Sequence, residues 1–315
     1  MIAAHSVQPT AGAIQKFARQ ESVPSRWSMT ATQNNEPHPP TAHSPRPHWT
    51  KSHGLGNDYL VVEPPRLPAG VALTPATVRL ICDRHRGVGS DGILESLPPA
   101  AMSDHFGLRI WNPDGSIAEK SGNGIRIFAK YLYDHGHTGA AAVSLDLAPD
   151  ARRAVAATVD MGRPRFDPRD SLAVLGQTFD VTILSVGNPH CVVFVADLDA
   201  IDFYALGPAI ERHPAFPDRT NVQFAQVLDS TRIRALIWER GAGETSASGS
   251  SSCAIAAASH RRGLVGDHVT VAMPGGELTI RIAPDDRLWL HGPVEEACQG
   301  TFSAELIARL RASAE

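Results

Sequence analysis

Short apolar runs rich in Val, Ile and Leu recur along the chain from residue 49 onward, and each is bounded by Gly, Pro, Asn or Asp. Runs of this length and composition are typical of β-strands. The expected strands cover residues 59–62, 108–111, 155–161, 181–184, 191–195, 232–238, 269–272 and 278–282. Strands therefore make up most of the predicted secondary structure.

Helical periodicity is confined to fewer segments. In residues 124–133, the side chains of Ile125, Phe128, Ala129 and Leu132 fall on one face of a helix. Similar patterns predict helices over residues 75–84, 252–262 and 304–312. Many strands with few buried helices favour an α+β fold in which mainly antiparallel sheets wrap central helices.

The chain also repeats a pattern of turns. Asn57 and Asn188 each stand in a Gly-Asn turn before an apolar strand, and Ser121 and Ser248 each open a helix with Ser-Gly. The two Asn-to-Ser intervals are 64 and 60 residues. This repeat predicts two pseudo-symmetric halves that bring two helix N-termini face to face across a cleft.

The first 48 residues differ from the rest. Residues 30–48 hold five prolines and no Val, Ile, Leu, Met, Phe, Tyr or Trp, so burial cannot offset their chain entropy. Lys16 and Arg19, with no acid in the first 20 residues, leave a targeting peptide open, although a start near Met29 is the simpler explanation. We expect a disordered extension over 1–48, an N-terminal half over 49–168 joined by a C-terminal helix within 301–315, and a C-terminal half over 169–300.

Composition narrows the class of protein. Lys plus Arg number 29 and Asp plus Glu 33, so there is no basic excess for nucleic acid. Four cysteines without a CxxC pair indicate free thiols in a reducing compartment and no metal motif. No apolar run is long enough to span a membrane, and no secretory signal is present. We expect a cytoplasmic protein.

The two Ser-Gly helix openings carry the first candidate chemistry. Ser121-Gly122-Asn123-Gly124 and Ser248-Gly249-Ser250 expose backbone N–H groups at the positive ends of helix dipoles. Such ends bind carboxylates or phosphates. Each serine alone is explained as a simple helix cap. As a symmetric pair, the two openings favour one anionic ligand held between them.

A second group of polar residues stands at strand ends. Glu239-Arg240 precedes a Gly-rich turn, either as an ion pair closing a strand or as a pair that recognises amino and carboxylate groups. His190 precedes an apolar strand, where a buried structural histidine is the commoner role. Asn57, Asn112, Asn188 and Asn221 each have an ordinary place in a turn.

Seven segments together closely resemble the motifs of the diaminopimelate epimerase family, in the family's order and over roughly residues 50–300. They are His53-Gly-Leu-Gly-Asn-Asp-Tyr, Arg86-Gly-Val-Gly-Ser-Asp-Gly, Trp111-Asn-Pro-Asp-Gly-Ser, Ser121-Gly-Asn-Gly-Ile-Arg, Gly187-Asn-Pro-His, Arg219-Thr-Asn-Val and Glu239-Arg-Gly-Ala-Gly-Glu-Thr. The resemblance implies two similar barrel-like halves around central helices, with the active site between them. It also implies cofactor-independent epimerisation of LL- to meso-diaminopimelate in the lysine and peptidoglycan pathway, with an amino acid as the small-molecule partner and a homodimer.

The resemblance also implies roles for individual residues. The backbone amides at Gly122-Asn123 and Gly249-Ser250 would hold the α-carboxylate at the reacting carbon. His190 and Glu239 would be polar partners beside the acid–base residues. The residues that read the two amino-acid ends of the substrate would be Asn57, Asn112, Asn188, Asn221, Glu239 and Arg240.

The sequence departs from the family at the reacting positions. There the family has two cysteines that exchange protons with opposite faces of the α-carbon, whereas this chain has Ser121 and Ser248. Cys253 is the nearest cysteine, and its place inside the helix predicts that it points away from the cleft. A laboratory replacement of two cysteines is the less economical explanation, because Glu119-Lys120 and Ser250–Ser252 deviate as well.

Serine is a much weaker acid than cysteine, whose ordinary pKa is about 8.5, and each pKa unit corresponds to about 1.4 kcal/mol. Two helix dipoles contribute roughly 0.3–2 kcal/mol each, so the serines would need a general base such as His190 or Glu239. Three hypotheses follow: a serine-based amino-acid epimerase or racemase, a proton-transfer isomerase of another small carboxylic acid on the same fold, and an amino-acid binder without catalysis.

Overall fold

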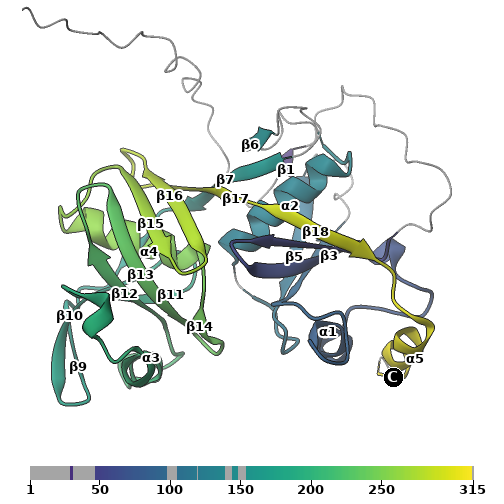
Figure 1. The fold of residues 1–315 in the computed structure, drawn as a ribbon, viewed down its shortest axis with the longest axis horizontal. Coiled ribbons are helices and arrows are strands. Elements are labelled where there is room, and N and C mark those ends of the chain that lie inside the picture. The colour runs from purple at the N-terminus through teal and green to yellow at the C-terminus, as the bar shows by residue number, and fades with distance from the viewer. Residues whose placement is uncertain are drawn as a thin grey trace, which may run out of the picture.

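Two β-sheets and their helices form two lobes in the computed structural model (Figure 1). The structure describes residues 29–30, 47–97, 105–118, 120–138, 144–147 and 154–313. The expected disordered extension 1–48 therefore lies outside the described residues, apart from residues 47–48 and β1 (Met29–Thr30), which pairs with β5. Among the described segments, no helix has the length and apolar character needed to cross a membrane.

The first sheet has six strands in the order β1-β5-β4-β3-β2-β18. Its members after β1 are β2 (Trp49–Gly54), β3 (Asn57–Val62), β4 (Ile93–Leu97), β5 (His105–Trp111) and β18 (Glu295–Gly300). The helix α2 (Gly122–Asp134) packs on this sheet through Ile127, Phe128 and Leu132, which are buried against strand residues. Phe128 and Leu132 belong to the apolar face that the helical spacing predicts, whereas the predicted Ile125 packs in the core of the second sheet and Ile127, outside the predicted face, packs here.

The outer face of the same sheet is covered by α1 (Pro75–Cys82) and α5 (Ala304–Ala312), and a short 3-10 turn follows β3 at Pro64–Arg66. Leu310 of α5 is buried in the same cluster as Val78 and Ile81 of α1. The C-terminal helix therefore completes the N-terminal lobe.

The second sheet is longer and follows the order β6-β7-β17-β16-β15-β13-β12-β11-β10-β8, with β14 on β13 and β9 on β10. The earlier strands are β6 (Ser144–Leu147), β7 (Ala154–Gly162), β8 (Arg165–Phe166), β9 (Ser171–Val174), β10 (Gln177–Ser185) and β11 (Pro189–Phe194). The later ones are β12 (Asn221–Val227), β13 (Arg232–Glu239), β14 (Gly243–Thr245), β15 (His268–Met273), β16 (Gly276–Ile282) and β17 (Leu288–Pro293).

The helix α4 (Gly249–Arg261) is the central helix of the second lobe. Every residue from Gly249 to Ser259 is buried, and the run Ala254–Ala258 places small side chains against the surrounding strands. Small side chains let the sheet approach the helix closely. A 3-10 turn at Leu198–Ala200 and α3 (Phe203–Glu211) pack on the other face of this sheet, where Phe203 contacts Phe224 and Trp238.

Strand pairing does not follow the expected boundary at residue 168. The strand β7 lies N-terminal to that boundary but pairs with β17, and β18 lies C-terminal to it but pairs with β2. Figure 1 shows β17 and β18 running in succession from one lobe into the other. Within the described residues both sheets stay open by their hydrogen-bonded order, so they curve around α2 and α4 without closing as barrels.

Candidate active site

The N-termini of α2 and α4 meet between the two lobes. Ser121 and Ser248 are their N-cap residues, and both have extended backbones, with φ of −140° and −142°. A Cβ atom on Gly122 would lie 3.2 Å from the Cα of Gly249, and one on Gly249 would lie 3.1 Å from the Cα of Gly122. Glycine is required at both positions because the two helix starts are in direct contact. The positive ends of two helix dipoles therefore converge on one place.

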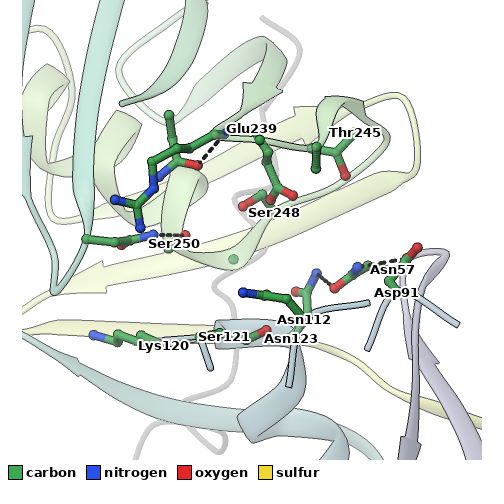
Figure 2. A pocket seen from close by; sticks show the side chains of 18 of the residues that line it. Asn57, Asp91, Asn112, Lys120, Ser121, Asn123, Glu239, Thr245, Ser248 and Ser250 are labelled. Carbon is green, nitrogen blue, oxygen red and sulfur yellow. Dashed lines mark hydrogen bonds between the residues drawn. The ribbon is translucent and has the colours of Figure 1, made fainter. Parts of the chain in front are cut away.

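A cleft of about 660 Å³ opens in front of these helix starts. It is lined by twelve of the thirteen residues that the sequence predicts for the site. These are Asn57, Asn112, Ser121, Gly122, Asn123, Asn188, Asn221, Glu239, Arg240, Ser248, Gly249 and Ser250. Figure 2 shows Asn57, Asn112, Ser121 and Asn123 on one side of the cleft and Glu239, Ser248 and Ser250 on the other.

Ser121 is held by two hydrogen bonds. Its Oγ accepts from the backbone N–H of Gly124 at 3.0 Å, which is a standard N-cap contact, and lies 3.1 Å from the hydroxyl of Tyr59. Burial raises the pKa of Tyr59 well above its usual range, and Glu239 and Asp91 raise it further. Tyr59 is therefore a neutral phenol whose hydrogen can point to Ser121, which leaves the Ser121 hydrogen to point elsewhere.

Ser248 has a different partner. Its side chain makes no cap hydrogen bond to its own helix and instead bonds the Glu239 carboxyl. Burial raises the pKa of Glu239, and the hydrogen bond from Ser248 opposes that rise. A carboxylate with a raised pKa is a stronger base than an exposed one. Figure 2 shows the Glu239 side chain directed toward Ser248. The two serines, alike in backbone, thus have unlike neighbours.

A chain of amides forms the wall of the first lobe. Asn123 donates from Nδ2 to the Asn57 side-chain oxygen at 3.0 Å, and Asn57 donates to the Asp91 carboxylate at 2.9 Å. Asp91 in turn accepts from Arg84 at 2.7 Å. The Asn123 oxygen is buried with no hydrogen-bond partner among the described residues, and it lies 3.2 Å from where a Cβ of Gly249 would be.

His190 lies behind the cleft and does not line it. Its Nδ1 accepts from the Gln223 side chain at 2.9 Å, and its Nε2 donates to the Asn188 oxygen at 2.9 Å. Burial, together with the charges of Lys120 and Arg240, lowers the pKa of His190 to about 3. The expectation that His190 serves as a base for a serine is therefore not met in this geometry. The ring is neutral, its lone pair is engaged, and its contact is with Asn188.

The wall of the second lobe is fixed by Asn221 and Arg240. Asn221 donates to the backbone oxygen of Pro189 at 2.9 Å and accepts from the backbone N–H of Arg240 at 3.0 Å. Asn188 approaches Ser250 Oγ at 3.5 Å, and Asn112 donates to Ser116 Oγ across its own turn at 2.9 Å. Asn112 and Asn221 thus bond to nearby chain segments and line the cleft at once.

Sequence reasoning missed twelve lining residues, among them Tyr59, Asp91, Lys120, Glu244 and Thr245. Asp91 and the Glu244-Thr245 pair stand inside motifs that already carry the family resemblance, which was a usable signal. In the sequence Tyr59 has the pattern of an ordinary strand residue, and only its contact with Ser121 identifies it as part of the site. Cys253 is buried and does not line the cleft, as its position in the helix predicts. Among the described residues, no three His, Cys, Asp or Glu side chains gather as metal ligands.

The sequence model of the family described as diaminopimelate epimerase matches residues 49–166 and 182–296, which is most of the chain. The chain belongs to this family. The diaminopimelate epimerase of Pelotomaculum thermopropionicum is 41% identical over 277 residues, covering 81% of this chain and 98% of that protein. Diaminopimelate epimerase 2 of a Nostoc species is 43% identical over 280 residues, covering 82% and 96%.

Solved structures agree with the fold of this family. A hydroxyproline epimerase from Agrobacterium vitis superposes with a TM-score of 0.60 at 17% identity, over 80% of this chain and 90% of that one. A predicted epimerase from Pseudomonas aeruginosa gives a TM-score of 0.56 at 17% identity, over 81% and 99%. At these identities the likeness concerns the fold alone.

Proposed function

We propose that this protein is an isomerase that needs no cofactor and inverts the α-carbon of a diaminopimelate-type amino acid, with Ser121 and Ser248 as the groups on its two faces. The observation that carries the proposal is the contact between Gly122 and Gly249. It points two serine N-caps and two rows of backbone N–H groups at one small volume inside the cleft. Family membership supports the same substrate class.

The carboxylate of the substrate would sit on the two helix starts. The N–H groups of Gly122, Asn123, Gly249 and Ser250 lie in the first turns of α2 and α4, where they lack partners within their own helices. A carboxylate bound there accepts hydrogen bonds from these N–H groups and interacts favourably with the positive ends of both helix dipoles. Removing the α-proton adds negative charge to that same carboxylate, so the site stabilises the intermediate more than the substrate.

The proton would leave on the Ser248 side. As the Ser248 oxygen takes the α-proton, its own proton passes to the Glu239 carboxylate, which becomes neutral. On the opposite face the Ser121 hydroxyl gives its proton to the carbanion. The resulting alkoxide is stabilised by the Gly124 N–H and the Tyr59 hydroxyl. Proton exchange of both groups with water in the open cleft restores the starting state.

This arrangement answers the weakness of serine as an acid. A serine without a base would face a barrier of about 1.4 kcal/mol for every pKa unit by which it is weaker than cysteine. A positioned general base contributes roughly 10²–10⁴-fold, and Glu239 is the carboxyl in hydrogen-bond contact with Ser248. The cleft is also lined by Asn112, Asn221 and Arg240, polar groups that suit a substrate with a second amino-acid group.

Deuterium exchange tests the proposal directly. The protein is incubated with LL- and with meso-diaminopimelate in D₂O, and the α-proton is followed by NMR. We expect loss of the α-proton signal together with interconversion of the isomers, and no exchange by a Ser121→Ala/Ser248→Ala variant.

A Ser121→Cys/Ser248→Cys variant tests the clamp separately. Exchange by this variant but not by the unmodified protein would refute serine-based epimerisation and favour an isomerase of another, more acidic carboxylic acid. Binding of diaminopimelate without exchange by either protein would identify a binding protein.

A further inference from the structure

A buried chain of hydrogen bonds reaches the cleft from behind, through Gln223, His190 and Asn188. Gln223 and His190 lie on the neighbouring strands β12 and β11, and both side chains are fully buried. The amide nitrogen of Gln223 lies 2.9 Å from His190 Nδ1 and 3.0 Å from Ser251 Oγ. On the other side of the ring, His190 Nε2 lies 2.9 Å from the side-chain oxygen of Asn188.

Gln223 sets the direction of these hydrogen bonds. Its amide nitrogen contacts both neighbours, whereas its oxygen is buried with no hydrogen-bond partner among the described residues. The reversed amide would bury two N–H donors without acceptors in place of one C=O, and buried N–H groups without acceptors are the rarer case in proteins. Gln223 is therefore the donor to the His190 ring.

The His190 ring passes this direction on to Asn188. Burial keeps the ring neutral, with a pKa of about 3, and a neutral imidazole has one acceptor and one donor nitrogen. Since Nδ1 accepts from Gln223, the proton is on Nε2, which donates to the Asn188 oxygen. The amide nitrogen of Asn188 is thereby turned toward Ser250 at the start of α4, where it lies 3.5 Å from Oγ, and both residues line the cleft.

We propose that Gln223 is a positioning residue that holds His190 in its Nε2–H tautomer and so presents Asn188 as a hydrogen-bond donor to a substrate carboxylate at the start of α4. The inference rests on the proposed function and gives two side chains behind the cleft a part in it. The N–H groups of Gly249 and Ser250 lie in the same first turn of α4. Asn188 would add a side-chain donor to this row of backbone donors.

The direction of the relay decides which end of an amino acid fits beside Asn188. A carboxylate oxygen accepts hydrogen bonds, whereas an ammonium group only donates them. An ammonium placed there would leave the Asn188 N–H groups without an acceptor, and a site loses much affinity when its buried polar groups are left unpaired. Reversal of the Asn188 amide would reverse this preference. Gln223 and His190 would therefore contribute to specificity without contacting the substrate.

Nitrogen NMR of protein with ¹⁵N-labelled histidine measures the tautomer without any ligand. The chain has 14 histidines, so the His190 signals are assigned by their absence from His190→Gln. We expect an unprotonated Nδ1 and a protonated Nε2 from about pH 5 to 8. Gln223→Met removes the donor at similar length and should give a mixture of tautomers. Gln226→Met is the matched control, because Gln226 also lies on β12 but donates to the Ala196 backbone oxygen, at 2.9 Å.

Calorimetry with meso-diaminopimelate tests the donor. We expect Asn188→Leu to weaken binding by roughly tenfold to a hundredfold, because a hydrogen bond to a charged group is lost. Asn188→Asp should bind about tenfold more weakly still, because it brings two carboxylates together. Gln223→Met should weaken binding by roughly twofold to tenfold, and Gln226→Met should bind as the unmodified protein does. Thermal unfolding checks that each variant folds, and a merely structural role of Gln223 would lower stability without changing the His190 tautomer.

The outcomes separate the two proposals. A protonated Nδ1 in the unmodified protein would overturn the relay and leave the proposed function standing. Asn188→Asp that binds diaminopimelate as tightly as the unmodified protein would do the same, because Asn188 would then accept from an ammonium group. The expected tautomer and binding losses without exchange of the α-proton in D₂O would overturn the proposed function alone. Absence of diaminopimelate binding by the unmodified protein would overturn both.

Discussion

The Cα of Gly249 lies 3.2 Å from the position that a Cβ of Gly122 would occupy. This contact joins the starts of the two central helices, one from each lobe. It means that the proposed carboxylate site belongs to neither lobe alone. The proposed binding of substrate would therefore be coupled to the mutual position of the lobes through two glycines.

A methyl group at this contact should force the helix starts apart. In Gly122→Ala the new Cβ would also lie 2.8 Å from Leu290 Cδ2. We expect a loss of about 1–3 kcal/mol in unfolding free energy, together with weaker binding of diaminopimelate. Chemical denaturation and calorimetry measure the two effects. Gly266→Ala is the control, because its nearest neighbour, the Ser230 oxygen, lies 3.8 Å away. Equal unfolding free energies of Gly122→Ala and Gly266→Ala would contradict a close contact between Gly122 and Gly249.

Glu239 should carry the proton that Ser248 passes on. We expect Glu239→Gln to slow α-proton exchange by roughly 10²–10⁴-fold, because the amide cannot accept that proton. Exchange is followed by NMR from each diaminopimelate isomer, with folding checked by circular dichroism. Glu277→Gln, at an exposed ion pair with Arg232, is the matched control and should keep full activity. A rate within threefold of the parent would exclude Glu239 as the base.

His190 should make stability fall in mild acid. Its pKa is about 3 in the folded protein, against about 6.5 unfolded, so the unfolded chain binds more protons between these values. The stability that depends on neutral His190 is fully present above pH 6.5 and is lost as pH falls toward 3. We expect the decrease in unfolding free energy from pH 7 to pH 5 to be about 2 kcal/mol larger in the unmodified protein than in His190→Gln. Urea unfolding at both pH values measures this difference. Equal decreases in unfolding free energy in the two proteins would mean that His190 is charged when folded.

Arg126 is a buried cation whose removal should stabilise the fold. Its guanidinium is fully buried, with no hydrogen-bond partner for any of its three nitrogens among the described residues, and burial lowers its pKa to about 10. We expect Arg126→Met to raise unfolding free energy by about 1–4 kcal/mol. Arg262→Met should do the reverse, because Arg262 is paired with Asp180. Denaturation curves of both variants test this contrast. A large loss of unfolding free energy in Arg126→Met would show that the Arg126 charge is compensated in the folded state.

Local pattern predicts many elements of this fold correctly. The eight expected strands all coincide with observed strands, the four expected helices with α1, α2, α4 and α5, and residues 304–312 match α5 exactly at both ends. Each of these segments has its own apolar period and its own turn residues. Some of the elements that were missed break that rule. In α3, Pro208 stands inside the helix, and packing of Gly207 against the Trp238 ring compensates for it.

Interior polar residues also hide strands from sequence reasoning. Strand β12 carries Gln223, which is fully buried because it donates to both His190 and Ser251. Strand β18 is polar and half exposed, and it exists because β2 supplies hydrogen bonds along one edge. No local apolar pattern marks β18, since its stability comes from partners distant in sequence.

The sequence by itself determined the family, the two Ser-Gly helix openings and half of the residues that line the cleft, because caps and turns depend on neighbours a few positions away. The tertiary structure decided the chemical character of those residues. Ser248 has a carboxylate partner and Ser121 a phenol, His190 is neutral, and partial burial lowers the pKa of Lys120. These properties depend on burial and on charges from other strands and the opposite lobe, which only the assembled fold brings within reach.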